Sequence, residues 1–317
     1  GYASSGDRAY YHLQDMTDDA ATAQAAVNTL STHYGGDAPE SLIPALYATA
    51  TGLALPGMSG WTGDRTSGYE GFSPCPAGMD TGWPCFRSGA VPIIVAIIDN
   101  RTHNGPPASP GGPDSNPYTA TGAAVCPSYM DTINALNAIN AKVVGVSVRG
   151  TTAQPDLNAI ATATGAVDGA GMPLVSVTAT DGTVSDAIVD QIRTLANDTP
   201  IDISVVFEDD PSDSVDTWSA FVDHLEANEA GDPGRGCAAR TGEDTDADGF
   251  PDTFRAVTPG EPVCFDIVVK QNDTVMPTGD PQLFRATLRV LGDGFTELDS
   301  RDVFFLVPPE IVVGGPD

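Results

Sequence analysis

Val91-Pro-Ile-Ile-Val-Ala-Ile-Ile-Asp99 is the stretch of sequence around which a fold can be predicted. Its apolar residues hardly alternate with polar ones, which is typical of a strand buried on both faces of a parallel sheet. The stretch ends on an acid, Asp99, and a polar loop follows it. Because ligands of open α/β sheets lie beyond the carboxyl ends of the strands, Asp99 is expected at a ligand-binding edge.

Segments with helical and strand-like spacing alternate on both sides of this stretch. The expected helices are Ala20–Leu30, Leu42–Thr51, Met130–Ala141, Pro155–Thr164 and Ser185–Leu195, and the further expected strands are Ala9–Met16, Val143–Val148 and Leu174–Val177. This βαβα order predicts an α/β fold with a doubly wound, mostly parallel sheet that helices cover on both faces.

After about Asn197 the spacing of apolar residues changes from helical to two. Ile201, Ile203 and Val205 alternate with polar residues, and similar runs recur near residues 263–269, 284–290 and 303–307. Such strands, joined by Gly, Asp and Pro turns, predict an all-β immunoglobulin-like sandwich. We therefore expect two domains, residues 1–197 and residues 198–317.

The composition limits the kinds of partner. The chain carries 43 acidic and 14 basic residues, a formal net charge of -29. So acidic a surface repels nucleic acid and anionic lipid and attracts cations, although a salty habitat would also favour it. No run of residues is long and apolar enough to predict a membrane span.

The five cysteines indicate an oxidising compartment. Cys75 and Cys85 flank one loop rich in Pro and Gly, and Cys237 and Cys264 flank a second loop. None belongs to a CxxC pair, so we expect two disulfides rather than zinc, and a secreted or cell-surface protein. Cys126 is left over.

The most specific motif is an acidic loop in the second domain. Its sequence is Asp244-Thr-Asp246-Ala-Asp248-Gly249-Phe250-Pro-Asp252. Carboxylates at every second residue, a Gly at the sixth position and the carbonyl of Phe250 at the seventh can surround one Ca²⁺. The EF-hand glutamate at position twelve is missing, and the loop resembles those of thrombospondin type 3 repeats. The alternative is an acidic, solvated turn.

A second group of carboxylates is expected at the edge of the parallel sheet. Asp37, Pro39 and Glu40 precede the helix predicted from Leu42, and they should face the same edge as Asp99. Three carboxylates there would repel one another unless a divalent cation lay between them. The alternative is helix capping by Asp37 and Glu40, with Asp99 in solvent.

These motifs, in this order, resemble a von Willebrand factor A domain, and more specifically the I-like domain of integrin β-subunits followed by its hybrid domain. Gly35-Gly-Asp37-Ala-Pro39-Glu40 is similar to the integrin loop Asn-x-Asp-x-Pro-Glu. Val95–His103 resembles the strand whose final Asp closes the adhesion site, and Leu157–Gly165 resembles a late helix of the family.

The resemblance implies a set of metal ligands. Glu40 and Asp99 would hold Mg²⁺ or Ca²⁺ with one open position, which an acidic group of a partner fills. Asp37 and the carbonyl of Pro39 would serve an adjacent calcium site. Gly35 replaces the integrin Asn, and the family's Asp-x-Ser-x-Ser motif does not occur in its expected context. We therefore expect an incomplete adhesion-type site, with the first strand and first helix of the A domain upstream of Gly1 and able to associate with this chain.

The motifs of common catalytic sites are not found, since the four histidines have no HExxH spacing and no GxSxG elbow occurs. We expect no enzyme. The sequence predicts an extracellular, metal-dependent adhesion or ligand-binding protein that binds a protein partner or assembles with itself. The alternative is a structural subunit of an extracellular filament or surface layer, stabilised by calcium and disulfides.

Overall fold

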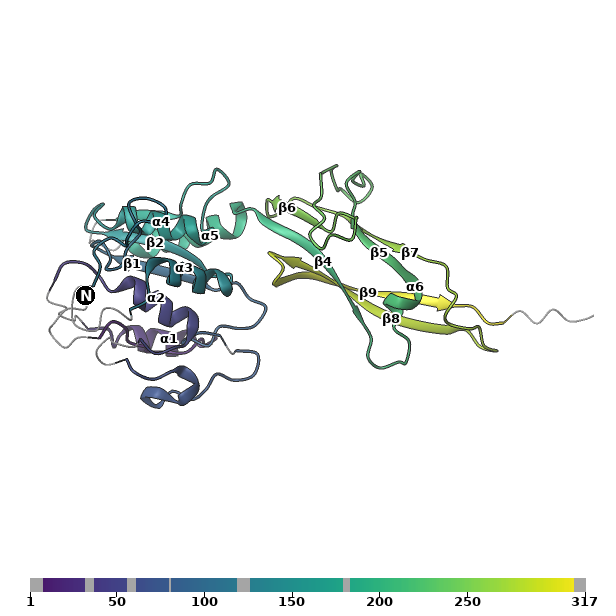
Figure 1. The fold of residues 1–317 in the computed structure, drawn as a ribbon, viewed down its shortest axis with the longest axis horizontal. Coiled ribbons are helices and arrows are strands. Elements are labelled where there is room, and N and C mark those ends of the chain that lie inside the picture. Colours follow the sequence, from purple (N-terminus) through teal and green to yellow (C-terminus); the bar gives the residue numbers. More distant parts are fainter. Residues whose placement is uncertain are drawn as a thin grey trace, which may run out of the picture. The chain divides into compact units, whose positions relative to one another are not determined.

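Figure 1 shows a computed structural model of the protein, which describes residues 8–31, 37–55, 61–79, 81–118, 126–178 and 183–310. The chain divides into two compact units, Gly1–Thr199 and Pro200–Asp317. The first is a mixed α/β unit with a parallel sheet, as predicted, and the second is built on antiparallel strands. None of the helices in the described ranges has the length and apolar content that crossing a membrane requires.

The parallel sheet of the first unit has the strand order β1-β2-β3. Its strands are β1 (Ile93–Ile98), β2 (Lys142–Val148) and β3 (Val175–Thr178). Ile93 of β1 lies opposite Lys142 of β2, and the parallel register continues to Ile98 opposite Ser147. The carboxyl ends of β1 and β2 therefore meet at one edge of the sheet.

Helices lie on both faces of this sheet. The helices of the first unit are α1 (Ala20–Val27), α2 (Leu42–Thr51), α3 (Tyr129–Ala138), α4 (Gln154–Ala163) and α5 (Val184–Asp198), with short 3₁₀ turns at Arg65–Ser67 and Tyr69–Gly71. Of these, α1 buries no residue, and α2 to α5 pack on the sheet. Side chains of α2, α3 and α4 share one core with Ala96 and Val143 of the sheet. Leu195 of α5 packs in a second core with Val144, which alternates with Val143 and so faces the other way.

β1 is not the central buried strand that its sequence predicts. It lies at the edge of the described sheet, and the side chains of Ile93 and Ile97 are 40% and 47% exposed. These residues alternate with Ala96, which is buried, and α5 packs on β2 and β3 instead of on β1. The prediction of burial on both faces is wrong for β1 and describes β2 instead.

Ala9–Met16 was expected to form a strand, but these residues adopt no regular secondary structure. Their inward side chains pack against aromatic rings: Tyr10 meets Trp61 edge to face at 4.9 Å, and His12 lies 5.7 Å from the ring of Trp83. The strand prediction is wrong: Ala9 and Tyr10 pack in a core of loop and α2 side chains, whereas Leu13 and Met16 are more than 40% exposed.

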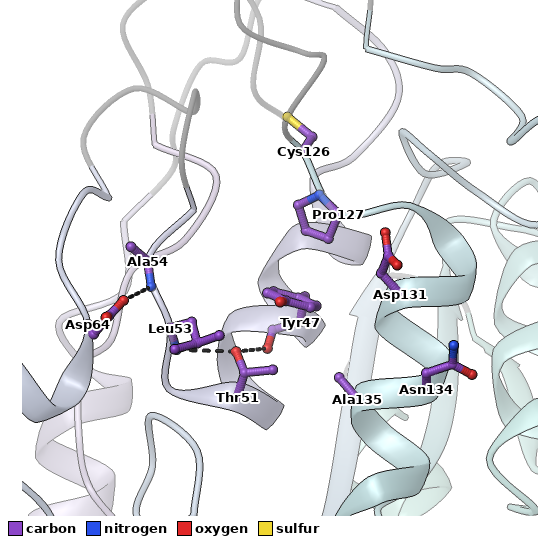
Figure 2. Close-up of a pocket in the computed structure, with 10 residues that line it drawn as sticks. All are labelled: Tyr47, Thr51, Leu53, Ala54, Asp64, Cys126, Pro127, Asp131, Asn134 and Ala135. Carbon is purple, nitrogen blue, oxygen red and sulfur yellow. Dashed lines mark hydrogen bonds between the residues drawn. The ribbon is translucent and has the colours of Figure 1, made fainter.

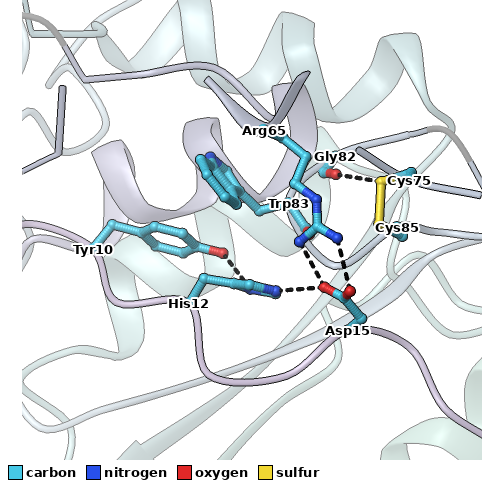
Figure 3. Close-up of a disulfide and its surroundings, with 8 residues drawn as sticks. All are labelled: Tyr10, His12, Asp15, Arg65, Cys75, Gly82, Trp83 and Cys85. Carbon is cyan, nitrogen blue, oxygen red and sulfur yellow. Dashed lines mark hydrogen bonds and ion pairs between the residues drawn. A yellow bond between two sulfur atoms is a disulfide. The ribbon is translucent and has the colours of Figure 1, made fainter. Parts of the chain in front are cut away.

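A network of polar side chains ties this segment to the loop closed by the Cys75–Cys85 disulfide (Figure 3). The guanidinium of Arg65, which is almost fully buried, donates two hydrogen bonds of 2.7 Å to the two oxygens of Asp15. Nε2 of His12 donates to Asp15 at 2.8 Å. Arg65 also donates to the carbonyl of Trp83 at 3.2 Å, so its ion pair with Asp15 joins residues 10–15 to the disulfide loop without backbone pairing to a sheet.

Acid is expected to destabilise the first unit through His12. Burial lowers the pKa of His12 below its ordinary 6.5, against the hydrogen bond and charge of Asp15, which raise it. The His12 imidazole therefore binds a proton more readily in the unfolded chain than in the folded chain. The free energy of unfolding falls as the pH drops below about 6.5. Melting temperature measured against pH should show this decline, and His12→Gln should flatten it. Asp15→Asn should instead change the profile at lower pH, because Asp15 has a depressed carboxyl pKa. An identical decline in His12→Gln would contradict the assignment.

The second unit consists of two antiparallel sheets that share a core. Ile203 and Phe254 from one sheet pack with Ala227 and Phe265 from the other. One sheet has the order β6-β4-β8-β9, and the other pairs β5 with β7. The elements are β4 (Ile201–Asp209), α6 (Thr217–Phe221), β5 (Val222–Ala227), β6 (Thr253–Val257), β7 (Phe265–Val269), β8 (Gln282–Gly292) and β9 (Thr296–Val307). The immunoglobulin-like assignment within this layered arrangement stays a prediction.

Candidate metal centre

The acidic loop of the second unit immediately precedes β6, and its two ends lie side by side. Its two ends pair where Glu243 meets Thr253: the amide of Glu243 donates to the carbonyl of Thr253 at 2.8 Å, and the amide of Thr253 donates back at 3.1 Å. The nine residues between them, 244–252, must therefore turn back on themselves.

Three carboxylates of this loop converge. Asp244, Asp246 and Asp252 each offer an oxygen, and these oxygens lie within 4.8 Å of one another. Within the ranges that the structure describes, this is the one group of three or more ligand-type side chains at such distances. The donor set is oxygen only, which suits Ca²⁺ rather than a transition metal. The backbone turns through left-handed conformations at Ala247 (φ 63°) and Gly249 (φ 100°), and Gly is the residue that tolerates the second.

Hydrogen bonds from the loop's own backbone hold two of these carboxylates in place. Asp244 accepts from the amides of Ala247 at 2.8 Å and Gly249 at 3.0 Å. Asp252 accepts from the amide and the hydroxyl of Thr245 at 3.0 and 2.6 Å. Partial burial raises the pKa of Asp252, but hydrogen bonds from Thr245 and Thr253 outweigh it and hold this pKa below its usual value. Asp252 is therefore ionised at neutral pH, as a calcium ligand must be.

Asp248 and Phe250, the other expected ligands, lie outside this group of three. Asp248 accepts a hydrogen bond of 2.9 Å from the amide of Phe250. The ring of Phe250 stacks on His224 of β5, with 3.5 Å between the ring centres. Phe250 thus attaches the loop to β5, and the ligand roles of Asp248 and of the Phe250 carbonyl stay predictions.

The surroundings of the loop are cross-linked. Both expected disulfides are present, and Cys237–Cys264 closes the segment that contains the loop. Arg255 of β6 donates to Glu243 at 2.6 Å and also bonds Asp202 of β4. A cation in the loop would therefore act on a part of the chain that is already fastened to β4, β5 and β7.

The second expected site is arranged differently. The loop before α2 does lie beside the loop after β1, because the amide of Glu40 donates to the carbonyl of Arg101 at 2.7 Å and Glu40 bridges to Thr102. However, Asp37 bonds Nε2 of His103 at 2.7 Å, and Asp99 bonds Arg149 at 3.1 Å.

Asp37, Glu40 and Asp99 consequently do not form a group of metal ligands in the described structure. Nδ1 of His103 lies 2.9 Å from the carbonyl oxygen of Asn116, and its Nε2 contacts Asp37, so both ring nitrogens have oxygen partners. The basic side chains of His103 and Arg149 thus contact two of the carboxylates between which a cation was expected. The roles of Asp37, Pro39, Glu40 and Asp99 in metal binding stay predictions, and Gly35 of the same motif lies outside the described residues.

The sequence did not reveal Asp156, which organises this edge of the sheet. Its side chain is fully buried in the first turn of α4. It accepts 2.6 Å and 2.8 Å hydrogen bonds from Nε of Arg101 and the amide of Thr102, and so fixes the loop that follows β1. An acid in the first turn of a helix is expected on the surface, where it complements the helix dipole, so no local signal indicated its burial.

A cleft between α2 and α3 contains the remaining cysteine (Figure 2). Its volume is about 920 Å³, and its lining includes Tyr47, Asp64, Cys126 and Asp131. Asp64 accepts a 2.6 Å hydrogen bond from the amide of Ala54, and Asp131 belongs to the capping box of α3. Burial raises the pKa of the Cys126 thiol, which lowers its thiolate fraction at neutral pH. The polar groups of the cleft thus serve the fold, and we assign no chemistry to it.

Comparison with known proteins gives matches among solved structures alone. No protein-family model and no curated protein matches the sequence. Among solved structures, the chain is similar to one described as von Willebrand factor type A from Catenulispora acidiphila, with 12% sequence identity and a TM-score of 0.25. The similarity covers 68% of this chain and 42% of that chain, so this chain spans less than half the length of that protein. A likeness at this level carries no argument about function, which rests on the geometry of the sites.

Proposed function

We propose that the chain is an exported, calcium-stabilised protein that binds a partner or assembles without catalysis. The observation that carries the proposal is the convergence of the Asp244, Asp246 and Asp252 carboxylates. Three like charges at this separation repel one another, and a bound Ca²⁺ would turn that repulsion into attraction. The two disulfides support an oxidising compartment outside the cytosol, where calcium is abundant.

In this proposal calcium acts on the fold and does not take part in a reaction. The unfolded chain cannot hold the oxygens of Asp244, Asp246 and Asp252 together, so binding energy adds to the stability of the folded second unit. The loop contacts β5 through Phe250 and is continuous with β6, so a stable loop keeps two sheets in register. The bound ion would make the second unit a rigid support for whatever surface binds the partner.

Calcium titration of the full chain by calorimetry tests the proposal. We expect one site whose affinity falls at least about tenfold in Asp246→Asn, since removing a charged ligand weakens a carboxylate site. Asp246 suits this test because only one of its oxygens accepts an intramolecular bond, from the amide of Asp248 at 3.1 Å, and Asn keeps that acceptor. The control is Asp273→Asn, which removes the same charge from an exposed loop. Equal calcium binding in the three proteins would refute the proposal.

The second candidate function is metal-dependent adhesion at the edge of the parallel sheet. The bridge between Glu40 and Thr102 favours it, because it brings the two expected ligand loops together. The basic partners of Asp37 and Asp99 oppose it, since a cation must displace His103 or Arg149. Magnesium titration of wild type and of Glu40→Gln distinguishes the two candidate functions. A second metal site that disappears in the variant supports adhesion. If wild type has no second site, calcium-stabilised assembly is the remaining candidate.

A further inference from the structure

The most exposed apolar side chains of the second unit gather at one end of it, where β9 finishes and β8 begins. They are Val269 (63% exposed), Met276 (75%), Leu283 (63%), Phe304 (56%) and Leu306 (64%). Leu283 lies directly opposite Leu306 in the β8–β9 ladder. Single exposed apolar residues are ordinary on a surface, but a contiguous group of this kind marks a contact with another molecule.

The backbone at this end is open as well. β9 is an edge strand of its sheet in the described chain, and a groove of about 310 Å³ runs beside it between Val269 and residues 304–308. The neighbouring Phe305 points inward and stacks on Phe221 at 5.1 Å, so Phe304 and Leu306 necessarily project from the opposite face. An added strand would find both unpaired backbone groups and apolar side chains.

Charged side chains hinder strand pairing along the first half of β9, whereas its second half carries none. Glu297, Asp299, Arg301 and Asp302 lie in the first half of β9, where charged side chains hinder pairing with another strand. Val303-Phe-Phe-Leu-Val307, the second half, has no charge and consists of strong β-formers. Pro308 and Pro309 follow and end any further pairing.

We propose that residues 303–307 of β9 pair antiparallel with the same residues of a second copy of this chain. Each copy has a net charge of -29, so two copies repel one another, and this repulsion is smallest when uncharged strands face each other. Centred on Phe305, the pairing sets Phe304 of one copy opposite Leu306 of the other and Val303 opposite Val307, without any facing like charges. The two four-stranded sheets then form one continuous sheet across a two-fold axis.

A second copy fits this edge better than a basic partner does. A cationic segment would select the acidic parts of the surface, whereas residues 303–307 offer it no carboxylate. The only lysine in the groove, Lys270, acts on Asp216 of its own chain. The pairing is independent of calcium in the acidic loop, since neither β8 nor β9 contributes a residue to that loop.

Sedimentation of the calcium-loaded full chain tests the pairing. The mass should rise from 32.7 kDa toward twice that value with protein concentration, and added NaCl should strengthen association because it screens the repulsion. Phe304→Lys and Leu306→Lys should each weaken association by roughly thirtyfold or more, since each change occurs twice in the interface. The control is Leu30→Lys, which alters an equally exposed residue (67%) of the first unit and should have no effect.

Disulfide trapping tests the register. In a Cys126→Ser background, the double variant Phe304→Cys/Leu306→Cys should give a covalent dimer under mild oxidation. Thr296→Cys/Leu298→Cys has the same spacing on the same strand and should stay monomeric. A chain that sediments as a monomer at every concentration overturns the proposal. So does association that both lysine variants leave unchanged, that salt weakens, or that is trapped through residues 296 and 298 instead.

Discussion

Asp156→Ala is expected to lower the free energy of unfolding of the first unit by about 1–3 kcal/mol, the cost of leaving a buried hydrogen-bonding group without its partner. The Asp156 side chain is fully buried, and so is Thr102. The amide of Thr102 donates a hydrogen bond of 2.8 Å to Asp156. The change leaves that amide without its acceptor and leaves Arg101 without its carboxylate at 2.6 Å. The loop after β1 should loosen as a consequence.

Denaturant unfolding followed by tryptophan fluorescence measures this loss. Trp218→Phe is a suitable background, because the two remaining tryptophans, Trp61 and Trp83, are buried in the first unit. Asp156→Asn is the matched variant: it keeps an acceptor for Thr102 and removes only the charge, so it should cost less than Asp156→Ala. A loss below about 1 kcal/mol in Asp156→Ala would show that the loop does not need the buried contact.

α2, α4 and the buried strand β2 could be predicted from the sequence because their signals are local. α2 spans Leu42–Thr51 as predicted, since its apolar spacing is interrupted by Gly52, which takes the left-handed conformation (φ 70°) at the end of the helix. α4 has its Pro in the first turn, where proline is tolerated. Signals of this kind need no knowledge of the rest of the fold.

The position of a strand within a sheet could not be predicted in this way. Ile93–Ile98 and Lys142–Val148 are both apolar on two faces, yet the first is an edge strand and the second is central. The difference depends on which helices cover each strand. β5 was missed altogether, because Val222–Ala227 mixes acidic, aromatic and apolar residues on both faces and its burial follows from pairing with β7.

The same contrast holds for the candidate sites. The convergence of Asp244, Asp246 and Asp252 lies within nine residues, so their spacing along the chain was enough to predict it. The contacts at the sheet edge join distant residues: Asp156 is 55 residues from Arg101, and His103 is 66 residues from Asp37. No periodicity links such pairs, so the sequence did not indicate that His103 and Arg149 would be partners of Asp37 and Asp99.

Chelation of calcium is expected to lower the melting temperature of the second unit and to leave that of the first unit unchanged. At a calcium concentration of about one hundred times the dissociation constant, binding to the folded state alone contributes about 2.7 kcal/mol. For a unit of this size, such a loss corresponds to a shift on the order of 10 °C. Scanning calorimetry with and without EDTA measures it, with the fluorescence of Trp61 and Trp83 in the Trp218→Phe background reporting the first unit.

Asp246→Asn separates the loss of calcium from the loss of an intramolecular contact. In EDTA the variant should be at least as stable as wild type, because it removes one of three converging negative charges and retains its acceptor for the amide of Asp248. In calcium it should gain much less than wild type does. The substitution thus does not destabilise the second unit in EDTA but does so in calcium, which a merely structural role of Asp246 cannot produce. If Asp246→Asn were equally destabilised with and without calcium, the loop would be a hydrogen-bonded turn and the calcium would have to bind elsewhere.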